Sequence, residues 1–266
     1  MTKRVLLVAL LIVLLPGVGA AQESAEDLAK KLANPVAALI SVPFQLNYDR
    51  GIGPADDGKQ WRLNIQPVVP LTLTPDWNLI SRTILPVIYQ DDIFPGAGDQ
   101  FGLGDTVQSL FVSPARPGPG GVIWGIGPVV LLPTATDDLL GGEKWGLGPT
   151  AVVLKQAGPW TYGMLVNHIW SVAGSDSRRD ISATFLQPFL SFTTKDAWTF
   201  SINTESTYDW KADQRSVPIN GSVSKVLKIG GQLLSVGAGV RYWAESPDGG
   251  PEGFGFRLVL TLLFPK

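Results

Sequence analysis

The sequence predicts an all-β protein, namely a twelve-stranded antiparallel transmembrane β-barrel preceded by a short N-terminal helix. Three observations predict this fold class. The chain begins with an export signal, it is poor in charge, and its apolar residues alternate with polar ones over many short segments. Only 17% of the 266 residues are charged although 45% are hydrophobic, whereas soluble domains carry about 25% charged residues.

The composition also excludes several classes of site. The chain has no cysteine and one histidine, so disulfide frameworks, thiolate metal sites and sites with several histidines are ruled out. The formal net charge of -2 and the absence of a basic run give no reason to expect a nucleic-acid partner. We therefore expect no metal site, no cofactor and no nucleic acid.

The first 21 residues have the pattern of a secretory signal peptide. Lys3 and Arg4 precede the apolar run 5–15, and the small residues 19–21 offer a cleavage site. This apolar run is too short for a membrane helix, which needs about 20 residues. We expect residues 1–21 to be a cleaved signal peptide, 22–35 a helical segment and 36–266 the barrel.

Residues 22–35 carry the signals of a short helix. Ser24 is a candidate N-cap, with Asp27 three residues later. Glu26 and Lys30 are spaced to form a pair along one helix face. Asn34 and the proline that follows it end the helix.

From Val36 onward the apolar residues recur at every second position. In the second segment, for example, Trp61 and Leu63 alternate with Arg62 and Asn64. This pattern is typical of a strand with one face in lipid and the other in a lumen. Twelve strands are predicted, an even number as bacterial barrels require: 36–49, 60–73, 77–89, 103–113, 121–133, 144–156, 159–173, 181–193, 197–209, 215–227, 232–244 and 253–264.

The joins between these strands alternate in length. Those after even strands are short, at 74–76, 114–120, 157–158, 194–196 and 228–231. Those after odd strands are mostly longer and acidic, at 51–59, 91–102, 134–143, 174–180, 211–214 and 245–252. Because such barrels have short periplasmic turns and long external loops, both chain ends are predicted to lie in the periplasm.

Aromatic residues recur near both ends of several predicted strands. Trp160 and Trp170 share a face, and ten residues of strand span ~33 Å. With a tilt of about 40°, this corresponds to a height of roughly 25 Å, the thickness of the apolar band. The predicted membrane girdle consists of Trp77 with Tyr89, Trp160 with Trp170, and Trp198 with Tyr208.

Charged residues at inward positions form the candidate site. By parity, the inward charges are Arg62, Arg82, Glu205, Arg241 and Arg257. The four arginines belong to strands that are contiguous once the barrel closes, so they are predicted to form one wall, with Glu205 facing it. Such a wall is either a selectivity surface, as charged rings are in channels, or a network of structural ion pairs.

The helical segment is the second candidate feature. It is attached next to the first strand and carries Glu26 and Asp27. Twelve strands enclose more space than their own side chains fill. We expect the helix to plug the lumen, with both carboxylates reaching toward the arginine wall. The alternative is a mobile periplasmic tail.

Three stretches add a resemblance to a known family. They are WNLISRTILPVIYQ at 77–90, WGIGPVVLLPTATD at 124–137 and KWGLGPTAVVLKQAGPWTYGMLVNHIWSVAG at 144–174. They resemble a largely uncharacterised family of Gram-negative outer-membrane proteins, grouped with transporters of the meta-pathway of phenol degradation. The resemblance implies an outer-membrane barrel that passes small compounds, including aromatic ones. The family offers no catalytic residues to carry over.

Three functions remain in view at this point. The first is passive passage of a small aromatic or hydrophobic molecule, with lipid, lipopolysaccharide and the barrel assembly machinery as partners. The second is a structural barrel with a filled lumen. The third, a membrane-embedded lipid hydrolase, needs serine and histidine on one outward face. Ser171 and Asn167 lie an odd number of residues from His168, so they point to the opposite face, and we expect no enzyme.

The loop alternation yields a labelling prediction. Single cysteines placed at Asp56, Asp138 and Arg178 are expected to react with a membrane-impermeant maleimide on intact cells, because their loops face outward. A cysteine at Thr194 is expected to remain unlabelled until the outer membrane is broken. The native chain has no cysteine to interfere. Labelling in the reverse order would contradict the predicted orientation.

Overall fold

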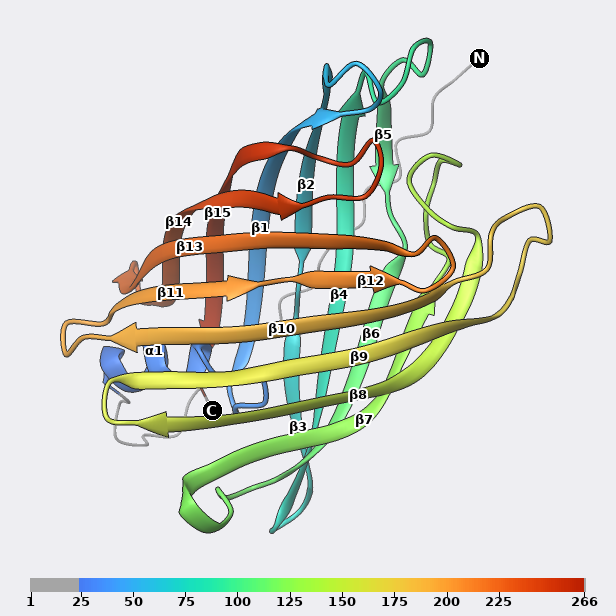
Figure 1. Cartoon of the computed structure of the whole chain (residues 1–266). Helices are drawn as coiled ribbons and strands as arrows, with labels where there is room; N and C mark the ends of the chain where they lie inside the picture. Colours follow the sequence, from blue (N-terminus) through green and yellow to red (C-terminus); the bar gives the residue numbers. More distant parts are fainter. Residues whose placement is uncertain (1–23, 266) are drawn as a thin grey trace, which may run out of the picture.

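One closed antiparallel sheet forms the molecule (Figure 1). This computed structural model describes residues 24–265, and the predicted signal peptide at 1–21 lies outside them. Residues 24–265 contain no helix long and apolar enough to cross a membrane. The elements are α1 (Ala25–Leu32), β1 (Ile40–Ile52), β2 (Gly58–Ile65), β3 (Val68–Thr74), β4 (Trp77–Asp91), β5 (Gln100–Leu103), β6 (Thr106–Pro114), the 3-10 turn Pro119–Gly121, β7 (Val122–Leu132), β8 (Lys144–Ala157), β9 (Trp160–Gly174), β10 (Ser182–Thr193), β11 (Trp198–Thr204), β12 (Ser206–Asp209), β13 (Gln214–Ile229), β14 (Gln232–Glu245) and β15 (Gly253–Phe264).

The fifteen strand segments make twelve crossings, as predicted, because three crossings are each broken into two segments: β2 with β3, β5 with β6, and β11 with β12. Each break lies opposite a proline of a neighbouring strand, namely Pro43, Pro86 or Pro188. Proline has no amide hydrogen to donate to the ladder. The breaks are therefore local consequences of proline within otherwise continuous crossings.

Two further prolines face each other across β7 and β8. Pro128 and Pro149 are register partners, and the pairing of β7 with β8 continues through them. In the described strands, however, the β6–β7 pairing is interrupted at Pro128 and the β8–β9 pairing at Pro149. The positions at which proline lacks an N–H therefore face β6 and β9 and not the other strand of the hairpin. The hairpin consequently pairs less completely with these two neighbouring strands.

Glycines beside these prolines allow a close approach of the backbones. A Cβ atom on Gly127 would lie 1.9 Å from the carbonyl oxygen of Leu110. A Cβ atom on Gly148 would lie 1.6 Å from the carbonyl oxygen of His168. Only a residue without a side chain fits at these two inward positions.

The two faces of the sheet follow the predicted alternation. On β9 the outward side chains of Trp160, Tyr162 and Met164 are exposed, whereas the inward side chains of Thr161 and Leu165 are buried. The same parity puts large apolar residues on the outside of β11, β14 and β15. An apolar exterior of this kind is what a strand needs in order to face lipid.

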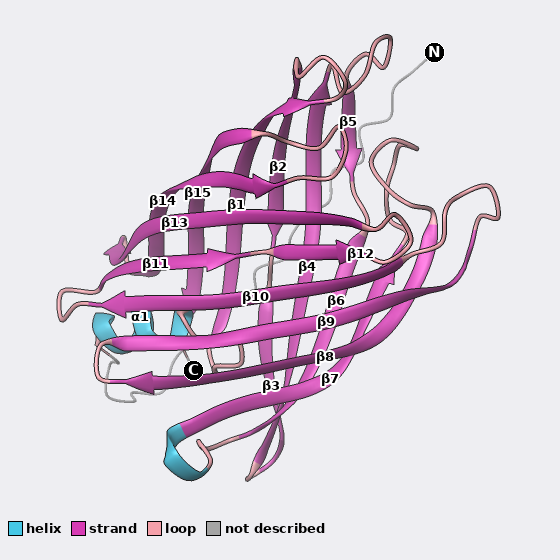
Figure 2. Cartoon of the chain, viewed as in Figure 1, coloured by secondary structure: helices cyan, strands magenta, loops and turns pink. Residues whose placement is uncertain are grey.

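The short turns gather at one end of the barrel and the longer loops at the other, here called the short-turn end and the long-loop end (Figure 2). Helix α1 lies at the short-turn end, inside the sheet (Figure 1). The Ser24 hydroxyl caps α1 by accepting the backbone N–H of Asp27 at 3.0 Å. Leu28 and Ala29 are buried against a cluster that includes Leu263 of the last strand.

The start of the first strand differs from the prediction. Residues 36–39 were expected to begin it, with Val36 facing lipid, but β1 begins at Ile40. Val36 instead points into the barrel and packs against Ile80 and Phe111. The alternating pattern extends to Val36 by coincidence, because these residues connect α1 to β1 across the lumen and their apolar side chains pack against its wall.

The parity of β2 yields a stability prediction. Ile65 faces outward, and Asn64 faces the lumen. Ile65→Arg is expected to reduce the free energy of unfolding by about 2–4 kcal/mol, since it places a charge in hydrocarbon. Asn64→Arg is the matched control and is expected to cost much less. Urea titration of both variants in lipid vesicles measures the difference, and equal losses would show that the faces are reversed.

Candidate functional site in the barrel lumen

The lumen wall has two chemically different halves. The buried side chains of Asp49, Arg241 and Arg257 come from the strands around the β15–β1 closure, whereas buried Lys144 begins β8 at the long-loop end. The large buried apolar side chains come mainly from β4 to β9. The charged and amide group comprises Asn47, Asp49, Asn220, Arg241 and Arg257. The apolar group comprises Ile80, Ile88, Phe111, Val129, Val152, Leu154 and Leu165. The packed interior of the barrel is therefore rich in charged and amide groups on one side and rich in hydrocarbon on the other.

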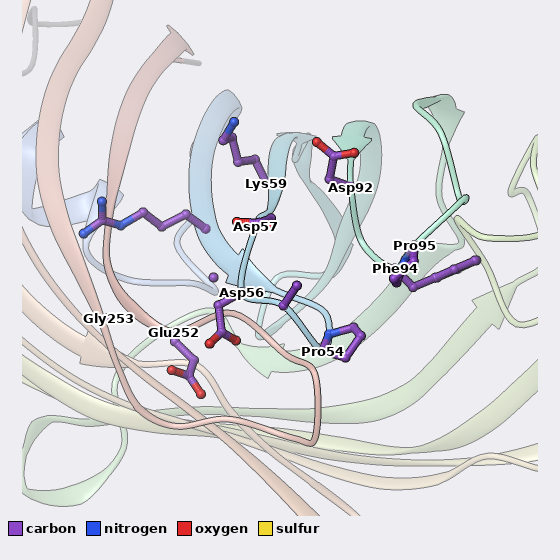
Figure 3. A pocket seen from close by; sticks show the side chains of 12 residues that line it. Pro54, Asp56, Asp57, Lys59, Asp92, Phe94, Pro95, Glu252 and Gly253 are labelled. Atoms are coloured by element: carbon purple, nitrogen blue, oxygen red, sulfur yellow. The ribbon is translucent and has the colours of Figure 1, made fainter.

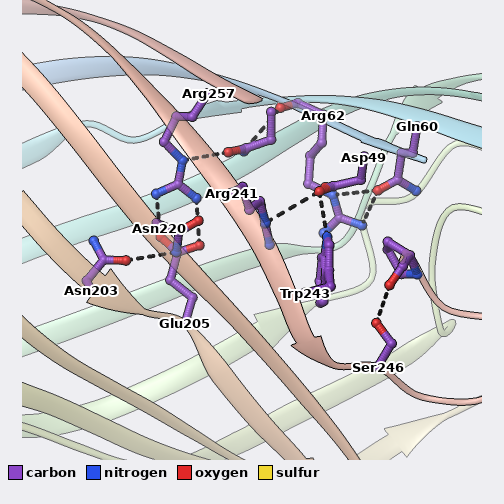
Figure 4. Close-up of polar contacts among 12 residues, drawn as sticks. Asp49, Gln60, Arg62, Asn203, Glu205, Asn220, Arg241, Trp243, Ser246 and Arg257 are labelled. Carbon is purple, nitrogen blue, oxygen red and sulfur yellow. Dashed lines mark hydrogen bonds and ion pairs between the residues drawn. The ribbon is translucent and has the colours of Figure 1, made fainter. Parts of the chain in front are cut away.

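Arg257 and Glu205 form the central ion pair of the lumen (Figure 4). Both terminal nitrogens of Arg257 donate to the Glu205 carboxylate, at 3.0 and 2.8 Å. The Nε of Arg257 donates to Oδ1 of Asn47 at 2.7 Å. The side chains come from β15 and from the break between β11 and β12, so the pair spans the inner faces of β13 and β14, which lie between them in the sheet. Such a bidentate pair is strong and directional.

A second ion pair lies nearer the long-loop end. The Arg241 Nε lies 3.4 Å from Asp49 Oδ1, and the Trp243 indole N–H donates to the same oxygen at 2.8 Å. The Arg241 guanidinium also lies 4.6 Å from the centre of the Trp243 ring. Asp49 and Trp243 were both at predicted inward positions, but the sequence analysis did not include them in the candidate site.

Arg62 and Arg82 have neutral hydrogen-bond partners. Arg62 donates from Nε and Nη2 to the side-chain oxygen of Gln60, at 3.1 and 3.0 Å. Arg82 donates from Nη2 to Gln66 at 3.2 Å. Since Asp49 and Glu205 pair with the other two arginines, the four arginines exceed the two carboxylates, and this layer of the lumen is positively charged.

The four arginines of the predicted wall lie on β2, β4, β14 and β15, and they do not share one kind of partner. Sequence parity places all five charged residues in the lumen, and the structure shows that Glu205 engages Arg257 in particular. Two arginines are structural partners of carboxylates, whereas Arg62 and Arg82 are held by glutamines. Both readings of the charged wall, as ion pairs and as a selectivity surface, therefore have residues that fit them.

Below the charged layer lies a cavity of about 290 Å³. Its floor is the last turn of α1 with the segment that follows it, up to Leu39, and its upper boundary includes Arg82 and Arg257. The side walls are mostly small polar residues, with Phe189 and Val68 on the apolar side. The cavity and the segment around the end of α1 therefore adjoin each other at the short-turn end.

The expected contacts of the helix with the arginine wall are wrong. Glu26 pairs with Lys30 at 2.6 Å, one helical turn away. Asp27 receives a hydrogen bond from the Ser24 hydroxyl at 2.7 Å. Local partners satisfy both carboxylates because they sit in the first turn of α1, next to the cap and to an i+4 lysine. The helix is instead attached by apolar packing and by a hydrogen bond from Gln156 to the Lys30 carbonyl oxygen, at 2.8 Å.

The predicted girdle residues lie on the outer surface near opposite ends of their crossings. Trp77 and Tyr89 stand at the two ends of β4, and Trp160 and Trp170 toward the two ends of β9. Trp198 begins β11, and Tyr208 lies in β12 of the same crossing. All of these residues except Tyr208 have exposed side chains. Their role at the membrane interface remains a prediction.

His168 has hydroxyl partners that the sequence analysis did not identify. Its Nδ1 lies 2.7 Å from the Thr184 hydroxyl and its Nε2 lies 3.4 Å from the Ser182 hydroxyl, both on the neighbouring strand β10. The His168 and Trp170 rings lie 4.1 Å apart. Within residues 24–265, no carboxylate or amide side chain hydrogen-bonds to His168, so this Ser–His pair lacks the group that orients the base in serine hydrolases.

The long-loop end carries an acidic hollow of about 840 Å³ (Figure 3). Asp56, Asp57, Asp92 and Glu252 line it, together with Lys59. Within the described residues, no group of three or more potential metal ligands is arranged to hold an ion. The hollow is open, and its acidic side chains lie on loops.

Ion pairs connect two of the loops at this end. Lys144 donates to the Asp180 carboxylate at 3.1 Å, and the Ser171 hydroxyl donates to the same oxygen at 3.1 Å. These hydrogen bonds hold the pKa of Asp180 below its ordinary value. Arg178 joins the same pair of loops through Glu143, at 2.7 Å. The mouth of the barrel is thereby braced on the β8–β10 side.

Comparison with known proteins identifies the fold. No protein-family model matches the sequence, and no curated protein matches it. A solved structure that is similar is the COG4313 outer membrane channel from Pseudomonas putida F1, with a TM-score of 0.66, 17% identity, and coverage of 85% of this chain and 96% of that chain. The chain has the fold of bacterial outer-membrane barrels.

Two other solved barrels are similar more distantly. The KdgM porin matches with a TM-score of 0.46 and 9% identity, covering 85% of this chain and 99% of that chain. The outer membrane phospholipase A from Escherichia coli matches with a TM-score of 0.46 and 12% identity, covering 85% of this chain and 96% of that one. These likenesses are too weak to choose between a channel and a lipase. The resemblance to phenol-pathway transporters stays a prediction.

The central ion pair yields a stability prediction. Glu205→Gln removes the charge that compensates Arg257, whose side chain is 6% exposed. The free energy of unfolding is expected to fall by about 3 kcal/mol, since an uncompensated buried charge remains. The control is Glu245→Gln, because Glu245 pairs with Arg215 at 3.7 Å on the surface and is expected to contribute at most about 1 kcal/mol. Equal urea midpoints for both variants and the native protein would contradict the structural role of the pair.

Proposed function

We propose that the protein is a passive outer-membrane channel for a small aromatic or hydrophobic solute. The observation that carries the proposal is the division of the lumen into a charged wall and an apolar wall. A porin for small hydrophilic solutes has a polar interior throughout. Here the half-buried apolar side chains of Val68 and Phe189 line the luminal cavity and pack on the buried cluster around Phe111, so an apolar solute can contact them while it passes.

The helix acts in this proposal as a plug at the short-turn end. Leu28 and Ala29 are buried against Val226 and Leu263, so α1 is packed on the barrel wall and is held there by the hydrophobic effect. A plug in this position restricts passage to small solutes. Undocking of the helix opens the route in full.

The structural alternative, a filled barrel without transport, rests on the paired charges. The Arg257–Glu205 and Arg241–Asp49 pairs support it. The cavity of about 290 Å³ and the amide-bound Arg62 and Arg82 favour passage, because a lumen that only fills space needs neither a cavity nor excess charge. The lipid-hydrolase alternative is less favoured, since within residues 24–265 the hydrogen-bond partners of His168 are hydroxyl groups and include no carboxylate or amide.

The proposed partners follow from the two surfaces of the barrel. The apolar exterior fits outer-membrane lipid, and the acidic loops at the long-loop end fit loose bridging to lipopolysaccharide through divalent ions. The last strand ends with an outward aromatic residue, Phe264. We propose that the barrel assembly machinery recognises this strand.

The plug yields a conductance prediction with a matched pair of variants. Ala29 is 3% exposed, whereas Ala25 is exposed on the same helix. Ala29→Asp buries a charge and is expected to undock α1, raising the single-channel conductance several-fold in planar bilayers. Ala25→Asp is expected to leave the conductance unchanged.

Deletion of residues 24–34 provides an independent version of the same experiment. It is expected to reproduce the high conductance of Ala29→Asp. If the native protein and both changed proteins conduct equally, α1 is not a plug. If none of the three conducts, the filled-barrel alternative holds.

A further inference from the structure

We infer that the luminal cavity between the plug and the charged layer is a binding site for a small organic anion, a carboxylate with an apolar body. The inference rests on the proposed function and names the class of solute that the lumen takes. Its residues are Arg82 from β4, Val68 from β3, Phe189 from β10 and Leu39 before β1, all of which line the cavity.

Arg82 is the residue suited to hold the carboxylate. A guanidinium has five N–H donors, and within the described residues the Arg82 side chain uses one, at Nη2, for Gln66. Arg257, the other arginine on the cavity, already gives both terminal nitrogens to Glu205 and its Nε to Asn47. Arg82 therefore retains the two-pronged geometry that matches a carboxylate.

The charge around the cavity favours an anion. Arg82 and Arg257 lie on its wall, and Glu205 is already paired with Arg257. A cation would meet a positive wall without a carboxylate to hold it. An anion gains a charged partner in a site where the walls exclude much of the solvent and weaken screening.

The apolar side of the cavity selects the body of the solute. Val68 and Phe189 line the cavity and pack on the apolar cluster of Ile80, Phe111 and Leu165. A small inorganic anion leaves this surface in contact with water, whereas an aromatic ring covers it. At roughly 30 Å³ for each water, the 290 Å³ cavity holds about ten waters, which is room for a molecule the size of benzoate.

Benzoate is the probe for a direct binding measurement. Isothermal titration of the full-length refolded protein is expected to show saturable binding of benzoate, with binding of benzyl alcohol and of acetate at least tenfold weaker. Benzyl alcohol lacks the charge, and acetate lacks the ring. Equal binding of all three probes, or no binding of benzoate, would overturn the inference.

Variants test whether Arg82 holds the carboxylate. Arg82→Gln is expected to weaken benzoate binding at least tenfold and to leave benzyl alcohol binding unchanged, and Arg82→Lys is expected to recover part of the loss. Arg215→Gln, at the surface pair with Glu245, is the control and is expected to change nothing. Val68→Ser is expected to weaken benzoate but not acetate, and it tests the site independently if Arg82→Gln fails to fold.

The failure of this inference differs from the failure of the proposed function. If the native protein conducts and passes benzyl alcohol, but binds benzoate no more tightly than Arg82→Gln does, the protein is a channel without the anion site. A protein that binds benzoate through Arg82 but conducts in neither the native nor the Ala29→Asp form has the site without being a channel.

Discussion

The pairing of β1 with β15 closes the sheet, and the rest of the structure depends on that closure. Hydrocarbon offers no hydrogen-bond partner, so every backbone group that crosses a membrane must be bonded within the sheet. A closed sheet has only two faces, and the side-chain alternation then assigns each residue to one of them. The apolar exterior and the charged residues of the lumen are both results of this single constraint.

The interior then has to be occupied, because twelve strands leave space at the centre. The protein fills it unevenly. One side is closed by apolar side chains and by Val36, and the other by the ion pairs of Arg257 and Arg241. Helix α1 covers the short-turn end. The open volume that remains lies between these parts and has charged residues on one side and apolar residues on the other. The proposed solute, a carboxylate with an apolar body, matches these two sides.

The sequence predicted the crossings and their faces well, because apolar and polar residues alternate along each strand, as in Trp61, Arg62 and Leu63. It did not predict which inward residues would meet. The contacts of Glu205 with Arg257 and of His168 with Ser182 depend on the register between strands, which parity does not specify. Val36 was misplaced for a related reason, since a connecting segment packed on an apolar wall shows the same alternation as a strand.

The position of α1 has a consequence for the order of assembly. The helix packs against Leu263, near the end of the last strand, and against Leu39, just before the first. Its docking site is thus complete only when the two ends of the chain come together. Docking of α1 therefore has to wait for the last strand of the barrel, and joining β15 to β1 encloses the helix in the same event.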